Sequence, residues 1–549
     1  MSLAVAAAVV LSFRGIYEPD LWWHLAQGRE DAAGRLVHAN IFNFIYPDFP
    51  QPYTPWLFDL GGYLAWRLAG GAGIQLAQAS LLALTFVLLY FACRQRATAS
   101  AALTILLLGF FVIEPRAIPR PHLASFAGVA ACTFLIERAR RLGSATPLRW
   151  AIPIVALWSN LHVECVFGVL LVGIFACTEI VRPSALPGRE ARRAALLAAG
   201  CLAATLVNPY GWGLEHYLYE NWHVSQVLTI AELQAAYLPN YRAFFVYLGV
   251  ATLLMLAQWR SIALWELAVA ALFAALGVKF LRFTPLLFLV TAPVLAERIG
   301  RLIARGLDRR AVLATALAAG LLISRQPIAT LARLQMGSRA VAPPLFVSPG
   351  LPAFVKTSGL RGPVFNSMNI GGYLAWELYP DTRIFQDGRL QAVPPEHFLA
   401  IVRASRSQPE WNALVAGVDW AVISLPRPNQ LSGAGQFPVA EWATVYWDEA
   451  VEVLVRRGGR FGALVERYEY ALLRPESDAF VLAERLDGPD VARLRAEARR
   501  NMADNPDGFA AAAVSCLLDD AAACQRLDRF AIERPLLRDP VRRIRQMRR

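Results

Sequence analysis

Charged residues are scarce in this sequence of 549 residues. Asp, Glu, Lys and Arg together make up 17% of the chain, whereas 56% of the residues are hydrophobic. The mean hydropathy is positive. Soluble domains of this total length carry more charge on their surfaces, so the composition favours a chain that is embedded in lipid.

Several motifs of soluble enzymes are missing. The sequence has no HExxH, no GxSxG, no P-loop and no GxGxxG between a strand and a helix. We therefore expect no nucleotide cofactor. The net charge of +12 comes mostly from arginines spread between apolar runs, with no compact basic patch interleaved with aromatic residues. Nucleic acid is therefore not an expected partner.

Cysteine is also rare, with seven residues in the chain. Five lie in or beside apolar runs, at spacings that match no zinc site: Cys93, Cys132, Cys165, Cys177 and Cys201. Cys516 and Cys524 lie in the soluble tail and could form a disulfide if that tail is extracytoplasmic. Their closeness in the sequence is equally compatible with chance.

What the sequence has in abundance is apolar runs, and they predict about eleven membrane spans within residues 1–325, since a span needs about 20 residues. The runs are 74–93, 99–113, 123–137, 163–180, 194–207, 243–258, 262–278, 280–296 and 311–324, with 148–158 as a further span or half-span. Met1–Phe13 lacks the features of a signal peptide, so we expect it to be the first span.

Arginines indicate the orientation, because short cytoplasmic loops carry an excess of Lys and Arg. They gather in alternate loops: Arg94 and Arg96, Arg138 to Arg149, Arg182 to Arg193, Arg260, and Arg298 to Arg310. We therefore expect a multi-pass protein of the bacterial inner membrane with a cytoplasmic N-terminus. The large first loop, 14–73, and the loops 114–122, 159–164, 208–242 and 279–282 then face outward.

Beyond Ser324 the pattern is that of a soluble chain. Short runs rich in β-branched and aromatic residues predict strands at 364–365, 383–385, 420–425, 444–447 and 451–455. Helical patterns follow at 464–472, 479–486 and 492–502. We expect a small extracytoplasmic α/β domain at 340–457 and a helical tail at 458–549. The fold class is thus an α-helical polytopic membrane protein followed by a small soluble α/β domain.

The first loop holds a candidate catalytic group. Tyr17–Leu25 (YEPDLWWHL) suits a helix in the membrane interface, with Trp23 and His24 beside Asp20. An aromatic belt explains the tryptophans alone. A carboxylate that is partly desolvated there has a raised pKa and can take a proton from a hydroxyl, which makes Asp20 the candidate base.

The loop Glu114–His122 (EPRAIPRPH) is a candidate phosphate site. Its three prolines restrict the backbone, so that Arg116, Arg120 and His122 are held at the membrane surface. Arginine forks bind phosphate oxygens with two hydrogen bonds. Pairing with lipid headgroups is an equally compatible interpretation.

Further polar residues lie at the outer ends of apolar runs, where such residues usually line a cavity. They are His162, Glu164, Glu232, Lys279 and Arg282. Because four histidines (His24, His122, His162 and His223) share this face with Asp20, Glu164 and Glu232, a divalent cation could bind there, although no metal motif is present.

Six segments stand in a fixed order along the chain: DLWWHLAQG (20–28), WLFD (56–59), RPH (120–122), WSNLH (158–162), NPYG (208–211) and RF (282–283). Taken in this order, they resemble the GT-C-like membrane proteins, relatives of the polyprenyl-phosphate-dependent transferases of the protein mannosyltransferase and aminoarabinose transferase type. Four segments of the soluble part resemble the extracytoplasmic domain that often follows in this group, namely 364–366, 371–374, 379–381 and 387–389. The resemblance covers the chain to about residue 456.

The resemblance implies that Asp20 is the catalytic base and that Arg116, Arg120, His122 and Arg282 hold the phosphate of the lipid donor. Thr54 and Pro55 stand where relatives often have His-Glu, so a second carboxylate of this loop is missing unless Asp59 replaces it. The DGR segment 387–389 is as compatible with a structural turn as with a site.

The implied function is transfer of a sugar from a polyprenyl-phosphate donor to an extracytoplasmic glycan, lipid or protein acceptor in envelope biogenesis. The alternative is a non-enzymatic transporter or scaffold for envelope lipid or polysaccharide assembly. A transporter often has charges near mid-membrane and repeated halves, and neither is found here. The sugar, the acceptor, the lipid chain length and the oligomeric state are left open.

Overall fold

The computed structural model describes residues 6, 10–13, 15–227, 231–237, 241–323, 347–425, 436–475, 490–506, 508–533 and 537–547. They fall into two compact units, which we treat separately. Unit 1 comprises Met1–Ala39 and Phe49–Ala342, and unit 2 comprises Asn40–Asp48 and Pro343–Arg549. Most of the expected first span, the boundary at Ser324 and the expected helix at 479–486 lie outside the described residues.

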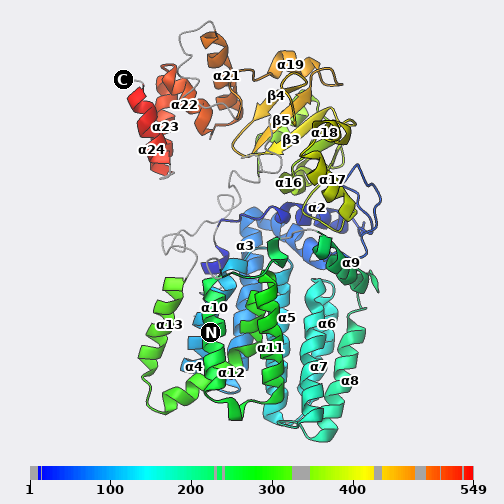
Figure 1. Cartoon of the computed structure of the whole chain (residues 1–549), viewed down its shortest axis with the longest axis vertical. Coiled ribbons are helices and arrows are strands. Elements are labelled where there is room, and N and C mark those ends of the chain that lie inside the picture. Colours follow the sequence, from blue (N-terminus) through cyan, green and yellow to red (C-terminus); the bar gives the residue numbers. More distant parts are fainter. Residues whose placement is uncertain are drawn as a thin grey trace. The chain divides into compact units, whose positions relative to one another are not determined.

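Unit 1 is a bundle of helices (Figure 1). They are α2 (Asp20–Ala32), α3 (Trp56–Arg94), α4 (Ala99–Ile113), α5 (His122–Leu142), α6 (Ala151–Trp158), α7 (Val166–Val181), α8 (Gly188–Ala204), α9 (Gly213–Val227), α10 (Arg242–Leu256), α11 (Leu264–Lys279), α12 (Thr284–Ala304) and α13 (Arg309–Ile323). Short 3-10 turns connect several of them: η1 (Glu114–Arg116), η2 (Thr146–Trp150), η3 (Val163–Cys165), η4 (Ala231–Leu233), η5 (Trp259–Ser261) and η6 (Leu281–Phe283).

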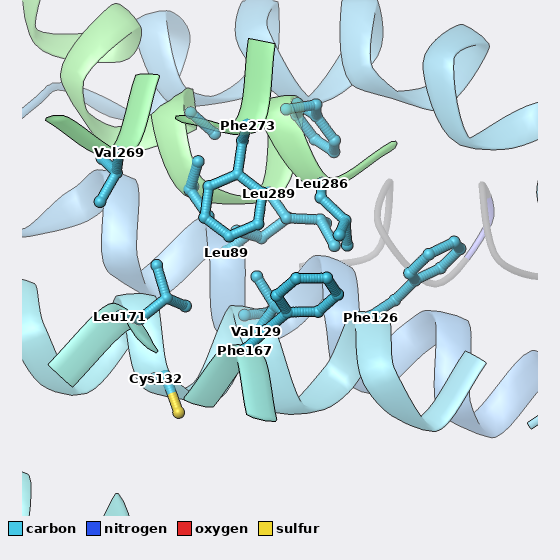
Figure 2. Close-up of a cluster of buried hydrophobic side chains, with 14 of the residues drawn as sticks. Leu89, Phe126, Val129, Cys132, Phe167, Leu171, Val269, Phe273, Leu286 and Leu289 are labelled. Atoms are coloured by element: carbon cyan, nitrogen blue, oxygen red, sulfur yellow. The ribbon is translucent and has the colours of Figure 1, made fainter. Parts of the chain in front are cut away.

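The core of unit 1 is formed by large apolar side chains from five helices. Figure 2 shows Leu89 of α3, Phe126 of α5, Phe167 of α7, Phe273 of α11 and Leu289 of α12 gathered in one cluster, all of them buried. The Phe167 ring packs edge-on against Phe273, with 5.5 Å between the ring centroids. Contacts between helices that are distant in the sequence thus hold the bundle together. The polar residues described below lie at its ends.

The prediction of about eleven membrane spans is wrong. Among the described residues, three helical segments are long and apolar enough to cross a membrane, namely Trp56–Arg94, Ala99–Arg116 and Val163–Val181. The first of these is interrupted at Gly70, whose positive φ of 54° a residue with a side chain rarely adopts. Unit 1 is thus compatible with membrane association through three candidate spans.

The overestimate has a physical cause: an apolar run does not set the length or charge of the helix that contains it. Helices α10, α11 and α13 have 15 or 16 residues. They rise about 24 Å, less than a hydrocarbon layer of about 30 Å. The run 148–158 gives only the eight residues of α6. The runs in α5 and α12 continue into charged turns that hold Glu137 and Arg298.

Unit 2 contains a mixed five-stranded sheet in the order β2-β1-β3-β5-β4. The strands are β1 (Gly362–Asn366), β2 (Thr382–Ile384), β3 (Trp420–Ser424), β4 (Trp442–Trp447) and β5 (Val451–Arg456). β1 runs parallel to β2 and β3, whereas β5 is antiparallel to β3 and β4. The five predicted strands are confirmed, because short buried runs between turn residues are distinctive.

Helices accompany the sheet in unit 2: α15 (Leu351–Ser358), α16 (Met368–Leu378), α17 (Pro395–Ala404), α18 (Gln408–Leu414) and α19 (Ala463–Tyr468). The tail forms α21 (Val491–Asp504), α22 (Phe509–Leu517), α23 (Ala521–Glu533) and α24 (Arg538–Met547). The helical pattern predicted at 492–502 is thus confirmed. A disulfide between Cys516 and Cys524 joins α22 to α23.

A segment of the first loop belongs to unit 2, which the sequence did not indicate. The backbone of Ile384 donates to the carbonyl oxygen of Phe42 at 2.9 Å, and Phe44 donates to Ile384 at 3.1 Å. The Asn43 amide donates to the backbone oxygen of Phe385. Asn43 therefore forms an isolated parallel bridge with Ile384 of β2.

Candidate functional site

Helix α2 lies across one end of the helix bundle of unit 1, where α9 also lies (Figure 1). Gly28 allows α2 to approach α3 closely, because a Cβ at this position would lie 2.1 Å from the backbone oxygen of Asp59. One turn earlier, His24 Nδ1 lies 2.6 Å from Asp59 Oδ1. The Trp23 ring is tilted against the His24 ring, with 3.5 Å between the ring centroids. His24 and Asp59 thus form a buried pair that anchors α2.

Arg120 is the centre of the candidate site. Its Nη2 lies 2.7 Å from Glu18 Oε1 and 2.9 Å from Asp20 Oδ2. Its Nη1 lies 2.6 Å from Glu232 Oε1. One guanidinium therefore holds three carboxylates, two from the segment before and at the start of α2 and one from η4, which is far away in the sequence.

Glu232 connects Arg120 to a second arginine. Its Oε1 accepts from Arg116 Nη1 at 2.9 Å as well as from Arg120. A single carboxylate oxygen shared by two guanidiniums occupies the kind of position that a phosphate oxygen takes between two arginines. Two arginines thus converge on one carboxylate oxygen, while Glu18 and Asp20 also pair with Arg120.

A second group lies around Glu164. Arg282 Nη2 donates to Glu164 Oε1 at 2.9 Å, and His162 Nδ1 lies 3.4 Å from Glu164 Oε2. The same ring nitrogen lies 2.7 Å from the hydroxyl of Ser125. Arg282, which the sequence predicts as a site residue, is thus paired with a carboxylate, as an arginine at the end of an apolar run requires.

Protonation states in the site follow from burial and from neighbouring charge. Burial raises the pKa of Glu18 above its ordinary value, although Arg120 opposes this and the Asp20 charge adds to it. For Glu232, burial opposes ionisation, but Arg116, Arg120 and Arg282 hold the pKa of its carboxyl well below its usual range. The charge of Arg282 therefore links the Glu164 group to the Arg120 group.

The two carboxylates beside Arg120 differ in access to solvent. The Asp20 side chain is 20% exposed, whereas that of Glu18 is 4% exposed. The backbone N–H of Asp20 also donates to Glu18 Oε1 at 3.1 Å. Asp20 is thus the more accessible of the two carboxylates, while Glu18 orients the start of α2.

The remaining predicted residues lie nearby in other roles. The His122 ring donates from Nε2 to the backbone oxygen of Arg116 at 2.7 Å, and burial holds its pKa well below the ordinary value. His122 therefore fixes the loop as a neutral residue and is a poor phosphate ligand. The Lys279 ammonium lies over the rings of Trp222 and Phe280, at 5.8 and 5.2 Å.

Glu18 is the site residue that the sequence reasoning missed. Its position two residues before Asp20 gave the signal, since the two form an acidic pair across Pro19. Within the described ranges, no group of three or more His, Cys, Asp or Glu side chains is arranged to hold a metal ion.

Neither the protein-family models nor the curated proteins that we compared with the sequence give a match. Membership of the GT-C-like group therefore stays a prediction that rests on the segments quoted from the sequence.

Proposed function

We propose that this protein is a membrane glycosyltransferase that moves a sugar from a polyprenyl-phosphate donor to an extracytoplasmic hydroxyl acceptor, which a glycan, lipid or protein provides. The observation that carries the proposal is the Glu232 oxygen held between Arg116 and Arg120, at 2.9 and 2.6 Å. A donor phosphate that displaces this carboxylate meets two guanidiniums already aimed at one point.

The reaction needs a base beside the phosphate, and Asp20 is the group that fits. Its carboxylate accepts the proton of the acceptor hydroxyl, the oxygen attacks the anomeric carbon, and the bond from that carbon to the phosphate oxygen breaks. Polyprenyl phosphate leaves with the bonding electron pair. Arg120 stabilises the charge that grows on the leaving phosphate, because its Nη2 contacts Asp20 and its Nη1 points to the position of the Glu232 oxygen, which the phosphate would take.

The membrane setting of the proposal rests on the three candidate spans and on the disulfide. Disulfides persist in oxidising compartments, so the pair Cys516–Cys524 supports an extracytoplasmic unit 2. Segment Asn40–Asp48 of the first loop belongs to unit 2, so we infer the same compartment for the first loop and for Asp20. The proposal therefore places the lipid-linked donor on that face.

A transfer assay tests the proposal. Membrane vesicles that contain the protein are given radiolabelled polyprenyl-phosphate sugars, and the label is followed into glycan, lipid and protein fractions. We expect transfer by the wild type and a loss of about tenfold or more in Arg120→Lys, because lysine keeps the charge but cannot hold three oxygens in a fork.

The control is Arg189→Gln, which changes an exposed arginine of α8 and should transfer at the wild-type rate. Equal transfer by Arg120→Lys and wild type, or no transfer with any donor, would favour the alternative of a non-enzymatic transporter or scaffold. In that case the ion pairs of the site serve only to hold the helices together.

A further inference from the structure

Unit 2 has a small hollow beside the turn at Asp387–Arg389. Its lining residues are Asn40, Asn43, Gln386, Asp387, Arg389, Ala392, Val393 and Phe398. The hollow measures about 200 Å³ with its open mouth included, and its enclosed part has room for about one water-sized group. A single polar group of a larger ligand fits this space.

The charge of the hollow is balanced by its own residues. Asp387 Oδ2 accepts from Arg389 Nε at 2.9 Å and from Nη2 at 2.6 Å, and Asp387 Oδ1 accepts from Nε at 3.1 Å. Arg389 Nη2 also lies 3.3 Å from the Asn40 side-chain oxygen, and its guanidinium lies over the Phe42 ring at 4.9 Å. An anion would meet Asp387 as well as Arg389, so the hollow does not favour anions.

Two polar atoms of the lining residues have no hydrogen-bond partner within the part of the chain that the structure describes. They are Arg389 Nη1, a donor, and Gln386 Oε1, an acceptor. The two residues are 8% and 4% exposed. Buried polar atoms in proteins are nearly always hydrogen-bonded, so Arg389 Nη1 calls for an acceptor and Gln386 Oε1 calls for a donor.

We propose that this hollow binds a hydroxyl group of a neutral sugar or polyol. A hydroxyl has both the lone pair that Arg389 Nη1 needs and the proton that Gln386 Oε1 needs, whereas an ionised carboxylate has no proton to donate. Phe398, Ala392 and Val393 provide apolar contact for the carbon skeleton of the ligand at the mouth. The Asp387–Arg389 pair is thus both a structural turn and the wall of a binding site.

The proposal does not depend on the transfer reaction proposed for unit 1. Its residues all belong to unit 2, and binding is measured without a lipid donor. A protein that binds sugar but transfers none would contradict only the transferase proposal, and the reverse result would contradict only this one.

The test is hydrogen exchange of the full-length protein in nanodiscs, followed by mass spectrometry over residues 386–398. The probes are methyl α-D-mannopyranoside, methyl α-D-glucopyranoside and glycerol, with sodium acetate as the anionic comparison. We expect saturable protection of this segment by at least one neutral probe and none by acetate. Gln386→Leu should weaken binding about tenfold, because one hydrogen bond to the ligand is lost.

Two further variants keep the test decisive. Arg389→Lys keeps a charge for Asp387 but removes the free donor, and it too should weaken binding. Arg383→Gln changes an exposed arginine of β2 and should bind as the wild type does. Exchange in β3 and β5 reports whether each variant is folded. Absence of saturable protection in the folded wild type means that the hollow holds only ordered water and overturns the proposal, as does stronger protection by acetate.

Discussion

Arg120 touches three carboxylates, and this sharing decides what each residue of the site can do. Glu18 is buried against it, Asp20 is the more exposed of the pair, and Glu232 is shared with Arg116. A phosphate can bind the arginines only if a carboxylate moves aside or takes up a proton. Glu232 is the group whose place the phosphate would take.

This arrangement predicts that Glu232→Gln binds polyprenyl phosphate more tightly than the wild type does. The amide no longer competes for Arg116 and Arg120 as an anion, so we expect a gain of about twofold to fivefold in affinity. Binding of a fluorescent polyprenyl phosphate to protein in nanodiscs measures it. Weaker binding by a folded Glu232→Gln would show that Glu232 organises the arginines rather than competing with the ligand.

A pH dependence is expected from Asp31, at the far end of α2 from Asp20. Burial, with a further contribution from the Asp59 charge, raises the pKa of Asp31 to about 8. The folded state therefore holds a proton on Asp31 that the unfolded chain loses above about pH 4. Stability should thus fall as the pH rises from about 4 to about 8, and no further above that.

Thermal unfolding in detergent between pH 5 and pH 9 measures this effect. Asp31→Asn carries no titrating carboxyl, so its unfolding temperature should decline less with pH than that of the wild type. Parallel declines in the two proteins would rule out Asp31 as the source of the dependence.

The roles of the site residues could be predicted from the sequence only in part. Asp20, Arg116, Arg120 and Glu232 stood out because polar residues at the ends of apolar runs need partners, and the structure brings them together. The neutral, structural role of His122 could not be predicted, because it follows from a hydrogen bond to the backbone of Arg116 that only the folded loop creates.

At the scale of elements, a buried ion network ties α5, α11 and α12 together through Arg96, which follows α3. Arg96 lies 2.5 Å from Glu137, 2.6 Å from Glu266 and 2.9 Å from Glu297. Its side chain is 6% exposed. From the sequence alone, we interpreted Arg96 as a loop charge that indicates the orientation in the membrane. Its pairing with acidic residues could not be predicted, because those partners are far apart in the chain.

Arg96→Ala should destabilise unit 1 by about 3–5 kcal/mol, since it removes from Glu137, Glu266 and Glu297 the buried arginine that they share. Arg301→Ala is the matched control. Arg301 pairs with Glu297 one turn away, and its side chain is 43% exposed, so we expect a loss of less than about 1 kcal/mol. Denaturant unfolding in mixed micelles compares the two. Similar losses in both variants would show that the network is not a special source of stability.

The sheet of unit 2 could be predicted, whereas the number of spans could not. The strand at Trp420–Ser424 is buried at every position and bounded by turns, so its pattern is unambiguous. A helix such as α10 is equally apolar, but its 15 residues are fixed by the turns around it and by tertiary packing. Hydropathy alone does not report where those turns fall.

For the whole molecule, the proposal requires that unit 2 and the first loop face an oxidising compartment. We expect Cys516 and Cys524 to be oxidised to each other in cells. Alkylation of denatured protein with a mass-tagged maleimide, with and without prior reduction, counts the thiols. Reduction should add two tags to the wild type and none to the Cys516→Ser/Cys524→Ser double variant.

If both cysteines were alkylated without reduction, unit 2 would face a reducing compartment, and the orientation inferred from the arginines would be wrong. A reporter fused after Met547 that is active only outside the cytoplasm gives an independent reading. It should be active in the full-length protein.

The central claim is that Asp20 takes the proton of the acceptor while Arg116 and Arg120 hold the donor phosphate. The measurement that tests it most directly is donor binding and sugar transfer on the same samples of wild type, Asp20→Asn and Glu18→Gln. The account predicts that Asp20→Asn binds donor nearly as the wild type does but transfers about a hundredfold more slowly or worse, with a smaller loss in Glu18→Gln. Transfer at the wild-type rate by a folded Asp20→Asn would contradict it.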